Sequence, residues 1–242
     1  MDPIRRCTWA ASATLLLSLA WGCDGEESDD TGDSGEPAAW ACGDDVEDDR
    51  DGAIYRTVAI GTQCWLRDNL DLGTMIESTT AGSQAHDDGV VEKYCWDNDQ
   101  GECDGTGSMK RGGFYEWQEA LQDWSGEPTL PVQGICPAGF HLPSREEWNA
   151  LVDLLGGTGE APARLATGGD SGFEALMTGY RCTMSGTFRP SAMSSATMTY
   201  FWTSEGSAAS VWLWEVGETS MQTFAFEPSL GLSVRCVGDL AP

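Results

Sequence analysis

The chain has 242 residues and a formal net charge of -26, from 39 acidic and 13 basic residues. This charge disfavours nucleic acid and anionic lipid as partners, because few cations are present to displace counterions from phosphates. Thirteen of the 39 acidic residues lie between Asp24 and Asp51, so much of the imbalance belongs to one segment near the N-terminus.

The first 22 residues have the layout of a bacterial lipoprotein signal peptide. Arg5 and Arg6 precede an apolar run over residues 10–20, which is shorter than the roughly 20 apolar residues that a membrane-spanning helix needs. The segment LAWGC ending at Cys23 resembles a lipobox, although Ala20 stands where such motifs usually have Leu. We expect residues 1–22 to be removed and Cys23 to carry lipid; the alternative is an ordinary cleaved signal without a lipid.

Residues 23–41 are predicted to form a disordered acidic tether. The segment after Cys23 has seven acidic residues, no basic residue and few apolar ones, so it cannot bury enough surface to offset its conformational entropy. The remaining residues, 42–239, have the length of one domain and are predicted to form a single one. The chain would then meet a membrane through its lipid anchor alone.

Seven cysteines remain in the predicted domain. In an exported chain we expect them to form disulfides rather than metal sites. Cys95 and Cys103 bracket a short loop and form the first predicted pair. The other predicted pairs are Cys136–Cys236 and Cys42–Cys64. Because seven is an odd number, Cys182 is left free or paired with another molecule.

A capped helix is predicted to follow Ser144. Ser144 and Glu147 have the spacing of a capping box, and two glycines at 156–157 end the helix. Its apolar stripe consists of Trp148, Leu151, Val152 and Leu155. We expect this helix to anchor the core, with His141 as a structural hydrogen bonder rather than a general base.

Other runs predict a second helix and several strands. Alternation over residues 54–60, after an Asp51-Gly52 turn, predicts a strand. Apolar residues at helical spacing, from Phe114 to Trp124, predict a short helix that opens at Gly113. Further strands are predicted over 173–181, 199–205, 210–216, 221–226 and 232–237. Together these runs indicate an α+β domain with its last strand beside its first.

Five ordered segments resemble the Fibrobacter succinogenes major paralogous domain, a family of bacterial surface and secreted proteins. They read IGTQCWLRDNL, GGFYEWQEAL, CPAGFHLPSREEWNAL, GYR and LSVRCV, and the likeness covers residues 43–239. The segments HLPSREEW and VRCV are also similar to the formylglycine-generating enzyme and the C-type-lectin-like fold. This resemblance implies two helices packed on small twisted antiparallel sheets with long loops, stapled by disulfides.

The enzyme activity of that second family is not expected here. A formylglycine-generating enzyme uses two nearby cysteines that bind copper. Cys182 has no second cysteine within ten residues on either side, so the pair is absent. We therefore predict a domain without this catalytic function.

Exposed tryptophans are the candidate ligand-binding residues. Trp212 and Trp214 alternate with Val211 and Leu213, so both faces of the strand over 210–216 are apolar. One face is expected to be core, and the other is either an aromatic strip for a ligand or covered as well. Trp96, beside Asp97 and Asn98, is the other candidate for stacking on a sugar.

Two acidic groups are candidates for binding calcium. Asp49 and Asp51 have the spacing of the first half of a calcium loop, but Val58 stands where the closing Glu belongs. The second group lies in the loop between Cys95 and Cys103 and consists of Asp97, Asp99 and Glu102. The alternative is that both groups are solvated turns, and no other cofactor is indicated.

These features predict a lipid-anchored module of a bacterial cell envelope or cell surface, outside the cytoplasm. It would bind a glycan or a cell-surface protein through loops and exposed aromatics, without catalysis. Two alternatives stay open: a carbohydrate-active enzyme, because the spatial separation of acid pairs cannot be derived from sequence, and a purely structural envelope protein, suggested by the odd cysteine and the tether.

Overall fold

The computed structural model describes residues 40–79, 84, 88–106, 110–122, 128–189 and 198–239. The predicted signal peptide, Cys23 and all of the tether before residue 40 lie outside the described residues. Within the described ranges, no helix is both long enough and apolar enough to span a membrane. The fold is mixed, with small and mostly antiparallel sheets, few helices and three disulfides.

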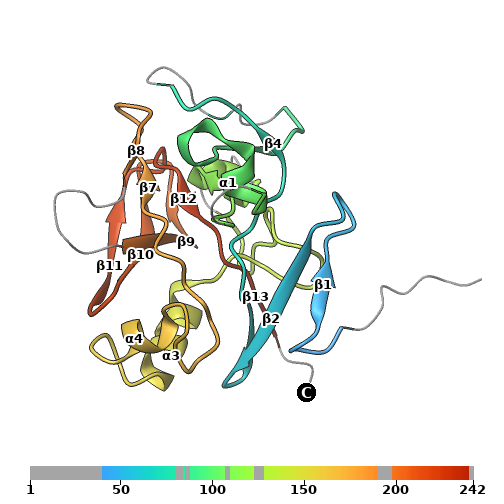
Figure 1. Cartoon of the computed structure of the whole chain (residues 1–242). Coiled ribbons are helices and arrows are strands. Elements are labelled where there is room, and N and C mark those ends of the chain that lie inside the picture. Colours follow the sequence, from blue (N-terminus) through green and yellow to red (C-terminus); the bar gives the residue numbers. More distant parts are fainter. Residues whose placement is uncertain are drawn as a thin grey trace, which may run out of the picture. The chain divides into compact units, whose positions relative to one another are not determined.

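An antiparallel sheet of four strands combines the two ends of the described chain (Figure 1). Its strands, in spatial order, are β1 (Asp45–Glu47), β2 (Ile54–Ile60), β3 (Gln63–Leu66) and β13 (Val237–Asp239). β2 has the predicted bounds. The last strand was expected beside the first predicted strand, but β3 separates it from β2, because β2 and β3 form a tight hairpin.

A second sheet has five strands. In spatial order these are β11 (Met221–Phe226), β10 (Ser210–Gly217), β9 (Met198–Ser207), β12 (Leu232–Ser233) and β6 (Phe114–Tyr115). The strands predicted over 199–205, 210–216 and 221–226 are confirmed. The run predicted over 232–237 is divided between the two sheets. Between them, the Arg235 side chain donates to the Phe173 carbonyl and Cys236 forms a disulfide with Cys136.

Two short strand pairs complete the strands of the described residues. β4 (Thr74–Met75) runs parallel to β5 (Glu92–Lys93), and β7 (Tyr180–Arg181) is antiparallel to β8 (Phe188–Arg189). The strand predicted over 173–181 is therefore confined to its last two residues. The 3-10 helix η1 (Trp96–Asn98) and helix α1 (Gln100–Asp104) follow β5.

The predicted anchor helix is α3 (Arg145–Leu154). The Ser144 hydroxyl accepts from the Glu147 amide at 3.2 Å, and the Glu147 carboxylate accepts from the Ser144 amide at 2.7 Å, so the capping box is confirmed. Trp148 is fully buried, with its ring 5.4 Å from that of Phe201 on β9 and 4.9 Å from that of Trp65 on β3. α3 therefore joins the two larger sheets.

The sequence predicted two helices, and the structure has more. The described residues hold four α-helices, of which three have five residues each: α1, α2 (Trp117–Leu121) and α4 (Ala161–Leu165). The helix predicted to open at Gly113 begins at Trp117, because the Phe114 amide and carbonyl pair with Tyr94 as a strand. Trp124 lies outside the described residues.

Disulfides join all three predicted pairs. Cys42–Cys64 links the start of the described chain to β3, Cys95–Cys103 links η1 to α1, and Cys136–Cys236 closes a loop with a sequence separation of 100 residues. Each contributes roughly 2 to 4 kcal/mol to the free energy of unfolding. Cys182 is free among the described residues.

Candidate functional site

The tryptophans predicted to form an exposed strip on β10 do not do so. Trp214 is 3% exposed, and its ring centroid lies 6.2 Å from that of Trp148 on α3. Trp212 is half-buried, and the guanidinium of Arg145 lies 3.7 Å from its ring centroid. Of the two alternatives for this face, an aromatic strip or a covered face, Trp214 therefore agrees with the covered one, because α3 packs against it.

Trp96 is half-buried on η1, away from β10 in the chain. The Arg111 guanidinium lies 4.8 Å from its ring centroid, and the Phe188 ring lies 5.3 Å away. In both tryptophans, an arginine guanidinium therefore covers one face of the ring. Neither residue lines the groove on the opposite face of the β9–β11 sheet, which is described next.

The opposite face of the β9–β11 sheet carries an aromatic groove of about 260 Å³. In the register of the sheet, Tyr200 on β9 lies opposite Glu215 on β10, and Leu213 on β10 lies opposite Phe224 on β11. Opposed residues project to the same face, so these four side chains form the floor. Phe226, at the end of β11, extends it. We call this site the aromatic groove.

Two other segments complete the aromatic groove. β7 and the turn after it contribute Tyr180, Cys182 and Met184, and residues 227–230 contribute Glu227 and Leu230. Figure 1 shows β7 and β8 beside the strands β9–β11. The Tyr180 and Tyr200 rings meet edge to face at 5.3 Å, which fixes one end of the groove.

Polar groups lie among these aromatic rings. The Gln222 amide donates to Glu215 Oε1 at 2.9 Å, which orients the carboxylate. Burial, together with the charge of Glu215, raises the pKa of Tyr200 well above its ordinary value, so its hydroxyl stays protonated at neutral pH. Glu227 is exposed at the edge. The groove is thus lined by flat apolar surfaces, the hydroxyls of Tyr180 and Tyr200, and two carboxylates.

Cys182 brings a free thiol to the aromatic groove. Burial alone would raise the pKa of this thiol, but hydrogen bonds from Ser185 and the Met184 backbone, with the charge of Arg189, outweigh it and lower the pKa below its ordinary value. The thiolate is therefore more populated near neutral pH than in an unperturbed cysteine.

The predicted calcium residues near Cys95–Cys103 have other partners. Asp99 caps α1, with its Oδ1 accepting from the Gly101 amide at 2.9 Å. Glu102 is buried, and its Oε2 accepts from Arg111 Nε at 2.9 Å. Asp97 is exposed. These carboxylates therefore act as a helix cap, an ion-pair partner and a solvated side chain rather than as a set of ligands.

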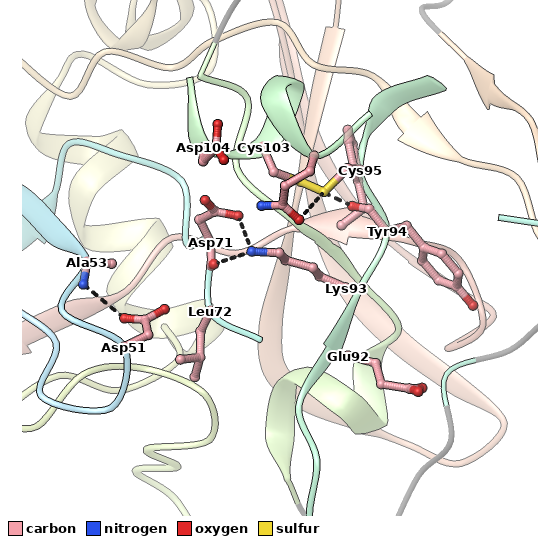
Figure 2. Close-up of polar contacts among 12 residues, drawn as sticks. Asp51, Ala53, Asp71, Leu72, Glu92, Lys93, Tyr94, Cys95, Cys103 and Asp104 are labelled. Carbon is pink, nitrogen blue, oxygen red and sulfur yellow. Dashed lines mark hydrogen bonds and ion pairs between the residues drawn. A yellow bond between two sulfur atoms is a disulfide. The ribbon is translucent and has the colours of Figure 1, made fainter. Parts of the chain in front are cut away.

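The second predicted calcium group is also a turn. Asp51 Oδ1 accepts from the Ala53 amide at 3.0 Å, as Figure 2 shows, and Asp49 is exposed. No group of three or more His, Cys, Asp or Glu side chains that could hold a metal occurs in the part of the chain that the structure describes. The geometry of the described residues does not support the calcium expectation at either place.

A buried charge pair that no sequence pattern indicated lies between these two regions. Lys93 Nζ donates to Asp71 Oδ1 and to the Asp71 carbonyl, both at 2.7 Å (Figure 2). Burial raises the pKa of Asp71 above its ordinary value, and the Lys93 ammonium opposes that rise. Because the Lys93 ammonium binds both the carboxylate and the carbonyl of Asp71, the pair fastens β5 to the segment after β3 rather than forming an open site.

His141 and Glu147 form a second polar cluster, at the start of α3. His141 Nε2 lies 2.6 Å from Glu147 Oε1, and the Ser144 hydroxyl donates to Glu147 Oε2 at 2.8 Å. Burial would raise the pKa of Glu147, but the hydrogen bonds from His141 and Ser144 outweigh it and lower that pKa. The hydroxyl faces Glu147 and not the imidazole, so this cluster has the geometry of a helix cap rather than that of a nucleophile and its base.

Comparison with known proteins identifies the type of domain. The family model for the Fibrobacter succinogenes major domain matches residues 58–238. That range holds α3, the whole five-stranded sheet and every residue that lines the aromatic groove, whereas β1 and the first half of β2 precede it. No curated protein and no solved structure gives a significant match.

Proposed function

Because this chain belongs to the Fibrobacter succinogenes major domain family and begins with the layout of a lipoprotein signal peptide, we propose that it is a non-catalytic envelope module that binds a glycan. The binding site is the aromatic groove. The predicted anchor places the module outside the cytoplasm, on a lipid at Cys23 and the tether over residues 23–41. In this proposal the domain has a C-type-lectin-like arrangement.

The observation that carries the proposal is the composition of the aromatic groove. Ligand sites are mostly apolar cavities with a few placed polar groups, and here Tyr180, Tyr200 and Phe224 lie beside Glu215. Phe226 is 46% exposed and Met184 is 85% exposed, so the rim presents large apolar side chains to water. Such surfaces on soluble proteins mark contact sites. Aromatic rings suit the apolar faces of sugars, and carboxylates suit their hydroxyls.

Charge and size narrow the class of glycan. The lining includes Glu215 and Glu227 but no basic residue, which favours a neutral sugar over an acidic one. The volume of about 260 Å³ lies just below the range of about 300 to 1,000 Å³ typical of drug-sized ligands. The groove therefore accommodates one or a few sugar rings of a chain that continues into solvent.

Calorimetric titration of the purified protein with neutral glycans, chosen from an array screen, tests the proposal. Phe226→Ala should weaken binding roughly tenfold, the loss that follows from removing one well-packed aromatic contact. Ile54→Ala is the matched control, because Ile54 is 54% exposed and lies on β2, outside the groove. No detectable binding of any neutral glycan, or equal losses of affinity in the two variants, would contradict the proposal.

The enzymatic alternative is favoured by one feature, the presence of two acids in the aromatic groove. Glu215 and Glu227 are the carboxylates that a carbohydrate-active enzyme could use there. Turnover of a polysaccharide that Glu227→Gln abolishes would establish catalysis. Binding of a glycan without any turnover favours the non-catalytic module.

The structural alternative depends on Cys182. A free thiol at the mouth of a groove can cross-link two chains, in which case non-reducing gels would show covalent dimers that Cys182→Ser abolishes. The glycan-binding module instead predicts monomers on the same gels, with or without reductant.

A further inference from the structure

Cations gather in one pocket of this acidic protein. Of the 13 basic residues in the chain, four line a single pocket of about 180 Å³: Arg56, Arg67, Lys110 and Arg235. Two acids, Asp68 and Glu174, also line it, so the cations outnumber the carboxylates by two. The pocket has room for a small ion or several waters. We call it the arginine pocket; it shares no residue with the aromatic groove.

The β2–β3 hairpin brings two of these cations together. Thr57 pairs with Leu66, and the Arg67 amide donates to the Arg56 carbonyl at 2.8 Å, so Arg56 and Arg67 oppose each other across the hairpin. Their side chains leave on the same face of the sheet. Like charges in directly opposed positions are destabilising, so a negative charge between the two arginines would stabilise this arrangement.

The two acids of the arginine pocket, Asp68 and Glu174, do not neutralise both arginines fully. Both carboxylate oxygens of Asp68 accept from Arg56, at 3.1 Å from Nε and 2.5 Å from Nη2. Glu174 Oε1 is 3.6 Å from Arg67 Nη2, which is beyond hydrogen-bond distance, and its Oε2 accepts from the Gly168 amide. Arg67 Nε is buried and has no hydrogen-bond partner among the described residues. A buried unsatisfied donor is often explained by a water or an ion.

Arg235 adds a buried charge behind the pocket. It is 1% exposed, and its guanidinium donates to the Phe173 carbonyl at 2.6 Å, the Leu66 carbonyl at 3.1 Å and Asn69 Oδ1 at 2.8 Å. All of these acceptors are neutral, and no carboxylate of a described residue lies within hydrogen-bond distance. Burial lowers the pKa of Arg235 to about 9, so the side chain keeps its charge at neutral pH.

We propose that the arginine pocket binds a small oxyanion, a carboxylate or phosphate-type group, with Arg67 as its main ligand. The planar guanidinium matches two oxygens of such a group. Lys110, whose ammonium lies 5.9 Å from the centroid of the Tyr55 ring, adds a further positive charge to the lining. The oxyanion is either a free ion or a group on a larger molecule such as an acidic sugar. The acidic remainder of the chain opposes this binding weakly, because charges more than about 8 Å apart are largely screened at physiological salt.

Calorimetric titration of the whole protein with inorganic phosphate, sulfate, acetate and glucuronate tests the proposal. Arg67→Gln should weaken binding of the preferred anion roughly tenfold, because a charged donor is lost. Arg164→Gln is the matched control: Arg164 is a partly exposed arginine that pairs with Asp170 at 2.7 Å and does not line the pocket. Tighter binding of glucuronate than of acetate supports a sugar source, and tighter binding of phosphate or sulfate supports a free ion.

A second substitution predicts the opposite sign. Asp68→Asn removes one negative charge while its amide oxygen can still accept from the Arg56 amide, a contact now 2.9 Å long. It should strengthen anion binding severalfold, whereas Phe226→Ala in the aromatic groove should leave that affinity unchanged. Absence of binding by all four anions at millimolar concentration, equal losses in Arg67→Gln and Arg164→Gln, or weaker binding in Asp68→Asn would each overturn the proposal.

Discussion

The two faces of the β9–β11 sheet differ in what covers them. On one face, Trp214 packs beneath α3 against Trp148 and belongs to the core. On the other face, Phe224 and Phe226 remain partly exposed and line the aromatic groove. Both faces are rich in aromatic residues, so the alternation of the strands does not decide which face is core. Each face contributes to a hydrophobic cluster, with Leu213 and Trp202 buried on the groove face and Trp214 buried beneath α3, so only the part of the groove face around Phe224 and Phe226 stays open.

The largest expected effect is on the covered face. Trp148→Ala should lower the free energy of unfolding by about 3 to 5 kcal/mol, because a buried indole that contacts Trp65, Phe201 and Trp214 leaves a cavity. Urea denaturation followed by circular dichroism measures this loss. A change below about 1 kcal/mol would mean that α3 does not cover the sheet in solution.

A second large effect is expected for the Cys136–Cys236 disulfide, which lies in the other hydrophobic cluster, together with Trp202 and Leu213 of the groove face. Joint replacement of Cys136 and Cys236 by Ala opens the longest loop closed by the three disulfides, with a sequence separation of 100. The free energy of unfolding should fall by about 2 to 4 kcal/mol. The variant is denatured under non-reducing conditions, and the unmodified protein is denatured both with and without reductant. An unchanged midpoint would show that this bond does not stabilise the domain.

A smaller, pH-dependent effect is expected at the cap of α3. Because the pKa of Glu147 is lowered from its ordinary value of 4.5, its contribution to stability is present above that value and is lost as the pH falls through the lowered pKa. Glu147→Gln can keep the capping box but not the charge. It should cost about 0 to 1 kcal/mol at neutral pH and flatten the decline in thermal midpoint between pH 5 and roughly 3. The same acid dependence in both proteins would contradict this role.

The smallest effect on stability is expected on the open face. Phe226→Ala should change the free energy of unfolding by less than about 0.5 kcal/mol, since the side chain is already 46% exposed. Its effect should fall on glycan affinity instead. A large loss of stability would show that Phe226 belongs to the core, and the contrast with Trp148 would then fail.

Local patterns predicted single elements and the disulfides better than they predicted which surfaces those elements cover. The capping box and stripe of α3 are set by residues within one helix, and β2 by alternation within one run. The division of residues 232–237 between two sheets was not predictable, because it depends on where Arg235 finds its carbonyl partners. The helix predicted from Gly113 was shortened because Phe114 pairs with Tyr94 across the fold.

The aromatic groove was not predicted for a similar reason. Its residues come from β7, β9, β10, β11 and the loop after β11, and their meeting depends on strand register. Sequence spacing placed Trp212 and Trp214 on one face but gave no sign that α3 would cover it. The alternation of Tyr200, Glu215 and Phe224 within their runs was visible, but their partners across the sheet were not.

Oxidative footprinting of the native protein, with and without a bound neutral glycan, tests the contrast between the two faces most directly. The account predicts that Met184 and Phe226 are modified in the free protein and protected by the glycan, while Trp148 and Trp214 stay unmodified in both states. Oxidation of Trp148 and Trp214 in the native protein, or a bound glycan that leaves Met184 and Phe226 unprotected, would contradict it.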